Sequence, residues 1–201
     1  MKKLLPIFSY LLHPLFIPVY ATAFYFFWTR DFFLPTEMYL MLVQVVILTV
    51  FIPIAVFYLL LSIGKIDSIM ISNLNQRKYP LMVNALLLYI LIQKSFTIER
   101  TPELYFFFLG GFASTLLALL FLLIGKKISI HMIGISSITV FIAGFSLKYQ
   151  ITFTATLAVL LILNGLVGSS RLQMKAHNLS ELALGFLGGC IPQILLYYFW
   201  L

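Results

Sequence analysis

Long apolar stretches, interrupted by short polar segments, account for most of this 201-residue sequence. Hydrophobic residues make up 62% of the chain and charged residues 9%, against roughly 45–50% and about 25% in soluble domains. This composition excludes a water-soluble globule, and it also excludes intrinsic disorder, which requires low hydrophobicity and high charge. Because backbone polar groups inside a bilayer must be satisfied within the segment itself, we expect membrane-spanning helices.

A spanning helix needs about 20 apolar residues to cross a hydrocarbon core about 30 Å thick. Hydropathy and helix-breaking residues divide the chain into about seven stretches. Pro14 and Pro18 are expected to delay or kink the first helix. The sequence predicts an all-α, polytopic transmembrane helical bundle of about six or seven spans, with residues 1–201 in a single integral membrane domain. The expected spans cover residues 10–28, 38–63, 81–93, 104–124, 130–147, 151–167 and 182–201.

The rare charged residues are unevenly distributed, and the formal net charge is +7. Seven crossings would place residues 64–80, 125–129 and 168–181 on the side of the N-terminus. That side holds nine of the 13 Lys and Arg residues but two of the six acidic residues. The positive-inside rule would make this side cytoplasmic. Alternatively, the clustered cations form an anion-binding site at the membrane surface.

The polar segment 168–181 contains the most informative residues. In a helical stretch His177 and Glu181 lie on one face, so the carboxylate can accept the imidazole N–H and fix its tautomer. The other ring nitrogen is then free to attack, and the planar fork of Arg171 suits phosphoryl oxygens. A structural alternative is that Asn178 and Glu181 cap the last helix while Arg171 and Lys175 are anchors at the interface.

A second polar group precedes the fifth apolar stretch. Ser129 and adjacent backbone N–H groups at a helix start can hold an anion. His131 follows in the first helical turn, as a packed helix residue or as a functional ionisable group within a span. Two of the three histidines therefore lie on one predicted side, each near a serine and a cation. This pairing suits phosphoryl transfer with one histidine as nucleophile and one as general acid.

These residues resemble the signatures of the type 2 phosphatidic acid phosphatase superfamily of integral membrane lipid phosphatases. The last signature of that family reads Ser-Arg, five residues, His, three residues, Asp. It is matched by Ser170, Arg171 and His177, with Glu181 in place of Asp. The middle signature, Pro-Ser-Gly-His, is similar to residues 128–131, which retain the serine and the histidine. The resemblance covers a phosphatase-like core of about residues 70–190.

The resemblance implies metal-independent hydrolysis through a phosphohistidine, with no cofactor. It assigns His177 as the nucleophile, Glu181 as its orienting carboxylate and His131 as the general acid. The first family signature, Lys, six residues, Arg-Pro, is represented loosely by Arg77, and its lysine is absent. Lys127 is the candidate substitute for that lysine. The phosphate-binding residues expected on this basis are Arg171, Ser129, Lys127, Arg77 and Ser170.

The expected function is dephosphorylation of a lipid phosphate or pyrophosphate, in a bacterial inner membrane, with the lipid tail between helices. A catalytically degenerate relative that binds anionic lipid or a partner is the first alternative, because Ile130 replaces the glycine of the middle signature. A small transporter with helices broken near prolines is the second. Walker and zinc-binding spacings are absent, and so is a large basic surface, so nucleotide, metal and nucleic-acid partners are not expected.

Overall fold

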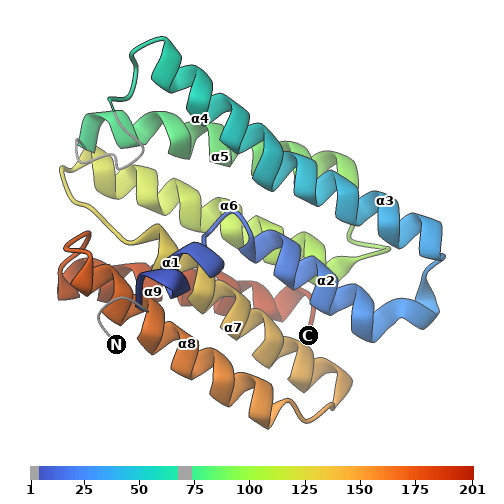
Figure 1. Cartoon of the computed structure of the whole chain (residues 1–201). Helices are drawn as coiled ribbons and strands as arrows, with labels where there is room; N and C mark the ends of the chain where they lie inside the picture. The colour runs from blue at the N-terminus through green and yellow to red at the C-terminus, as the bar shows by residue number, and fades with distance from the viewer. Residues whose placement is uncertain (1–4, 68–73) are drawn as a thin grey trace.

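The computed structural model of the protein describes residues 5–67 and 74–201, and this part of the chain is helical without strands (Figure 1). The predicted all-α class is therefore confirmed. The elements are α1 (Leu5–Leu11), α2 (Ile17–Thr29), a 3-10 turn (Arg30–Phe32), α3 (Pro35–Val46), a π-helical turn (Ile47–Phe51), α4 (Ile52–Ser62), α5 (Leu74–Ser95), α6 (Pro102–Leu123), α7 (Ile130–Tyr149), α8 (Thr154–Gln173), α9 (Leu179–Leu196) and a closing 3-10 turn (Tyr197–Phe199).

Five helical segments in the described part of the chain are long and apolar enough to cross a membrane. The first is a continuous 28-residue helix in which the π-helical turn joins α3 to α4. In its most apolar stretch of 18 residues, 17% is buried inside the protein, so most of its apolar surface faces outward. The protein is therefore an integral membrane protein. The five segments are Pro35–Ser62, Pro102–Leu123, Ile130–Tyr149, Thr154–Gln173 and Leu179–Phe199.

The expected count of six or seven spans is not confirmed. Two of the seven predicted segments are not among the described helices that are long and apolar enough to cross a membrane. Helix α2 begins only at Ile17 and has 13 residues, or about 20 Å, which is shorter than the hydrocarbon core. The delay expected from Pro14 and Pro18 is thus observed, and the residues before the break form the separate helix α1. Helix α5 has 22 residues, but its first turns carry the polar run 75–78.

Helix α7 lies at the centre of the bundle and packs against α6, α8, α9 and α2. Ile135 and Phe141 in this helix are fully buried. Glycines on α9 let its backbone approach α7 closely: a Cβ atom at Gly189 would collide with the hydroxyl of Ser136 and the carbonyl of Ile133. Small residues at helix contacts are a common means of close packing in membranes. This contact brings the N-termini of α7 and α9 together.

Isolated polar side chains within the apolar stretches link neighbouring helices. The amide nitrogen of Asn84 on α5 donates to the hydroxyl of Thr115 on α6 at 3.2 Å. The amide nitrogen of Asn164 on α8 donates to the hydroxyl of Thr139 on α7 at 2.9 Å. Each pair satisfies a polar group that would otherwise be costly in an apolar environment. These amides therefore contribute to helix association.

The two ends of the bundle differ in charge. The α6–α7 and α8–α9 connections lie at one end, and the α5–α6 and α7–α8 connections lie at the other (Figure 1). At the second end two acidic residues pair with cations, Glu37 with Arg100 at 2.9 Å and Glu103 with Lys148 at 2.8 Å. The first end contains the cations of the α6–α7 and α8–α9 connections. The candidate site lies there.

We expect Gly189→Ala to weaken the α7–α9 contact, because the added methyl group would force the two backbones apart. Overpacking of this kind costs about 1–3 kcal/mol, so the variant should unfold at a lower temperature in detergent. Gly111→Ala on α6 is the matched control, since a Cβ atom there meets nothing within 4 Å. Equal thermal stability of the two variants would contradict this account of the packing.

Candidate functional site

The turn between α8 and α9 forms one wall of the site. Helix α8 continues past the predicted apolar stretch to Gln173, which places Arg171 in its last turn. The end of the helix is closed by hydrogen bonds from the Lys175 amide to the Leu172 carbonyl at 2.9 Å and from the Ala176 amide to the Arg171 carbonyl at 3.1 Å. Lys175 has a φ of 52°, the left-handed conformation that usually favours glycine at this position.

Helix α9 begins with a capping box. The Asn178 side chain accepts a hydrogen bond from the Glu181 amide at 2.9 Å, and the Glu181 carboxylate accepts one from the Asn178 amide at 3.3 Å. These bonds satisfy amides that have no partner within the helix. The structural alternative predicted for this pair of residues is therefore confirmed.

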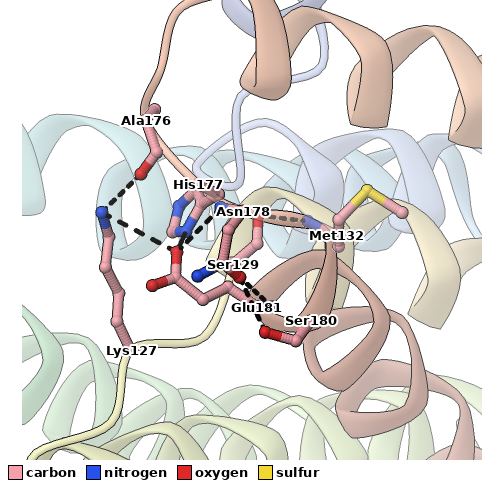
Figure 2. A network of polar contacts seen from close by, with 8 residues as sticks. All are labelled: Lys127, Ser129, Met132, Ala176, His177, Asn178, Ser180 and Glu181. Atoms are coloured by element: carbon pink, nitrogen blue, oxygen red, sulfur yellow. Dashed lines mark hydrogen bonds and ion pairs between the residues drawn. The ribbon is translucent and has the colours of Figure 1, made fainter.

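The same carboxylate also binds His177. Nδ1 of His177 lies 2.8 Å from Oε2 of Glu181 (Figure 2). His177 precedes α9 and is not helical, so the expected shared helical face is wrong. The contact forms instead because the capping box turns the carboxylate back over the residues before the helix. Glu181 thus has a structural role and a second role as the partner of a buried imidazole, whose side chain is 3% exposed.

The environment of His177 keeps its imidazole neutral. The pKa of His177 is lowered to about 4, chiefly by burial. The charges of Lys127 and Arg171 also lower this pKa, and the bond to Glu181 acts in the opposite direction. A neutral imidazole carries one N–H. With that N–H on Nδ1 and donated to Glu181, Nε2 holds the free lone pair. At neutral pH the side chain therefore has the protonation state and orientation that a nucleophile would need.

Lys127 connects the α6–α7 loop to the α8–α9 turn. Its ammonium group donates a hydrogen bond to the Ala176 carbonyl and lies 4.0 Å from Oε2 of Glu181 (Figure 2). Burial lowers the pKa of Lys127, and the charges of Arg77 and Arg171 act in the same direction, against Glu181. An open hollow of about 350 Å³ lies beside it. The hollow is lined by Lys127, Leu172, Lys175, Ala176, His177, Asn178 and Glu181.

Two arginines add to the positive potential around this hollow. Arg171 and Arg77 lie close enough to act on each other and on Lys127. One nitrogen of the Arg171 guanidinium contacts the Met174 sulfur at 3.8 Å, while its buried Nε has no hydrogen-bond partner in the described part of the chain. Arg77 on α5 lines a smaller neighbouring recess, which it shares with Lys127. The three cations predicted to bind phosphate, Arg77, Lys127 and Arg171, thus lie near one another.

The two predicted serines make structural contacts instead. Ser129 is fully buried; its hydroxyl accepts a hydrogen bond from the Met132 amide at 3.4 Å and its own amide donates to the Glu181 carbonyl at 3.1 Å. Ser170 is also fully buried and shares a 2.6 Å hydrogen bond with Ser9 on α1. Neither serine lies among the residues that line the hollow, so their role in binding phosphate stays a prediction.

His131 lies near the hollow but is not part of its lining. Its ring packs edge to face against His13, with 5.0 Å between the ring centroids and 86° between the planes. His13 occupies the break between α1 and α2 and belongs to no recognisable motif. Only the proline beside it marks the break that places it here. His131 nevertheless lies close enough to Arg171 and His177 for their charges to act on it.

The chain matches no family model among known protein families, no curated protein and no solved structure. The class of the protein is therefore inferred from the geometry of the site. That class is an integral membrane protein with a buried histidine–carboxylate pair in a basic hollow at one end of its helices.

We expect Glu181→Gln to lower the pKa of His177 further and Lys127→Gln to raise it, because the carboxylate favours the charged imidazole and the ammonium group disfavours it. Titration of ¹⁵N-histidine-labelled protein in micelles by NMR would measure both shifts, with His177→Asn assigning the signal. Shifts in the same direction in the two variants would contradict the described electrostatics.

Proposed function

We propose that this protein is a membrane-embedded phosphatase that hydrolyses a lipid phosphate or pyrophosphate through a phosphohistidine, without a metal ion. The observation that carries the proposal is the 2.8 Å bond between His177 and Glu181 on the wall of a basic hollow. A neutral, oriented imidazole beside several cations is the arrangement that nucleophilic attack on a phosphoryl group requires. The resemblance of residues 170–181 to a phosphatase signature supports the same reaction.

In the proposed reaction, Nε2 of His177 attacks the phosphorus atom, and the bond to the leaving oxygen breaks with its electron pair going to that oxygen. A leaving alcohol takes up its proton from water, and a leaving phosphate departs as an anion. Glu181 stabilises the positive charge that develops on the imidazole, and Lys127 stabilises the phosphoryl oxygens. Arg171 does not line the hollow and contributes through its charge. Water then attacks phosphorus, the P–N bond breaks, and its electron pair returns to Nε2. Ser129, Ser170 and His131 have no part in this proposal, because their contacts lie outside the hollow.

A lipid substrate is proposed because the hollow lies at the end of helices that are long and apolar enough to cross a membrane. The phosphate would enter the hollow from the membrane surface while the tail remains in the bilayer. By resemblance, we propose the bacterial inner membrane as the location.

A non-catalytic protein that binds anionic lipid is the second candidate. The specific observation in its favour is that Ser129 donates its amide to the Glu181 carbonyl and that His131 packs on His13. The two residues of the middle signature are thus engaged elsewhere. The cations of the hollow would still attract a phosphate head group.

Purified protein should release inorganic phosphate from lipid phosphates or diphosphates in the presence of EDTA. His177→Ala should abolish the release, and Glu181→Gln should lower it by about 10–100-fold, as expected when the partner of a functional histidine is lost. Lys126→Gln is the matched control, because this exposed lysine does not line the hollow. The rate should fall as the pH drops through about 4, where His177 becomes protonated.

Phosphate release by His177→Ala at the rate of the natural sequence would contradict the phosphohistidine mechanism. Stable binding of anionic lipid without any phosphate release would favour the second candidate.

A further inference from the structure

We propose that helix α1 is an acid-sensitive cover at the end of the bundle that carries the hollow. At neutral pH it lies across the start of α7 and the end of α8, and protonation of His13, in the break between α1 and α2, releases it. The release would make Arg171 accessible from the hollow. It would therefore regulate access to this site whether or not the hollow is catalytic.

Helix α1 is small and lies at the surface of the bundle. It has seven residues, fewer than the roughly 12–15 that an isolated helix needs to be stable in water. Ile7, Tyr10 and Leu11 are exposed, whereas Ser9 is 1% exposed. One side of the helix therefore holds it against the bundle, and its position depends on the contacts of that side and on the break that follows.

Ser9 attaches α1 to two neighbouring helices. Its hydroxyl shares a 2.6 Å hydrogen bond with the hydroxyl of Ser170 on α8. Its backbone contacts the imidazole of His131 on α7. Ser170 is fully buried, so α1 separates this part of α8 from the surroundings. Movement of α1 would break both contacts and uncover both side chains.

Arg171 connects the covered groups to the hollow. It follows Ser170 in α8, and it is close enough to Tyr10 of α1 for the two side chains to interact. Its charge also acts on Lys127 and His177, which line the hollow. Its buried Nε has no hydrogen-bond partner in the described part of the chain. Release of α1 would thus expose a guanidinium with a free donor beside the hollow.

The break between α1 and α2 depends on a neutral His13. The Leu15 amide donates a hydrogen bond to Nδ1 of His13 at 3.3 Å, so Nδ1 carries no proton in this arrangement. A proton on Nδ1 would place two donors against each other. Pro14, between the two residues, has no amide that could form a replacement bond. Protonation of His13 would therefore remove a bond that fixes the break.

The ionisable groups around His13 also oppose its protonation. They are His131 on α7, whose ring centroid lies 5.0 Å from that of His13, Arg171 on α8, Tyr10 on α1 and Tyr20 on α2. No carboxylate in residues 5–67 and 74–201 is among the charges that act on His13. Burial lowers the pKa of His13, and the charge of Arg171 lowers this pKa further.

Acid therefore favours the released helix. In water the imidazole of His13 regains its ordinary pKa of about 6.5, which is above its pKa under the cover. The covered state is fully favoured above pH 6.5 and becomes less stable as the pH falls below it. Between pH 7.5 and pH 5 the ratio of covered to released molecules should fall by up to about 30-fold. His177, with a pKa of about 4, stays largely neutral over this range.

Distances between spin labels, measured by pulsed electron spin resonance in detergent micelles, test the movement. Cys190→Ser removes the natural cysteine, and labels at Ile7→Cys and Val159→Cys, two exposed positions, report the distance from α1 to the middle of α8. We expect this distance to increase between pH 7.5 and pH 5. Labels at Val159→Cys and Leu187→Cys, on α8 and α9, are the control. Their distance should not change, which would exclude general unfolding.

Three variants test the role of the break. His13→Asn does not titrate, and its side-chain oxygen can accept the Leu15 amide two residues on, so α1 should stay in place at pH 5. His13→Arg is permanently charged and should release α1 at pH 7.5. Ser9→Ala removes the bond to Ser170 and should shift the ratio about fivefold towards the released state at every pH.

Two results would overturn the inference. The first is a distance between the labels at Ile7→Cys and Val159→Cys that does not change at pH 5, either in the natural sequence or with Ser9→Ala. The second is an equal response to acid in His13→Asn and in the natural sequence.

Access to Arg171 is tested at constant pH. Phenylglyoxal modifies arginine side chains that it can reach, and mass spectrometry of the peptides gives the rate at each site. At pH 7.5 Arg171 should be modified several-fold faster in His13→Arg than in the natural sequence. Arg30, which is exposed, is the internal reference and should react equally in both. Equal rates at Arg171 would overturn the inference.

These measurements need no substrate, so they are independent of the proposed function. If acid releases α1 but no lipid phosphate is hydrolysed, the proposed phosphatase function fails and the inference about the cover stands. If lipid phosphates are hydrolysed but α1 keeps its position at pH 5, the inference is overturned and the proposed function stands.

Discussion

Glu181 makes the contacts on which the geometry of the site depends. Its carboxylate accepts hydrogen bonds from the Asn178 amide and from His177, and its backbone carbonyl accepts one from the Ser129 amide. The first bond starts α9, the second orients the imidazole, and the third attaches the N-terminus of α7 to the N-terminus of α9. A single residue therefore couples the beginning of a helix, the tautomer of a histidine and the contact between two chain segments.

Close helix packing makes these contacts possible. At Gly185 a Cβ atom would collide with the Ser129 carbonyl, and at Gly189 it would collide with the Ser136 hydroxyl. Both glycines lie on α9 and face α7. Because the two backbones touch, the loop that carries Lys127 reaches the turn that carries His177, and Lys127 can bind the Ala176 carbonyl. The basic hollow is thus a consequence of the small residues on α9.

Part of the candidate site was predictable from local spacing. Arg171, His177 and Glu181 lie within eleven residues of one another, so a helix end followed by a helix start keeps them close in almost any bundle. The reason for their proximity was not predictable from the sequence, because the contact of His177 with Glu181 arises from a capping box and not from a shared helical face. The positions of Ser170 and His131 could not be predicted from local spacing, because they depend on contacts between distant segments. Ser170 binds Ser9, 161 positions away, and His131 packs on His13, because α1 packs against α8 and the break before α2 lies beside the start of α7.

The sequence alone determined that this chain is helical and integral to a membrane, because its apolar stretches have the length and composition that a bilayer imposes on every spanning segment. It also determined that positive charge collects between particular stretches, since the order of apolar and polar segments settles which of them share an end of the bundle. The tertiary structure decided which of those polar residues meet. Lys127, Lys175 and His177 line one hollow, whereas Ser129, Ser170 and His131 face other partners. The reason is physical: hydropathy acts on whole segments, but a hydrogen bond depends on the rotation and depth of each helix, and these are set by packing at particular glycines and at the break beside Pro14.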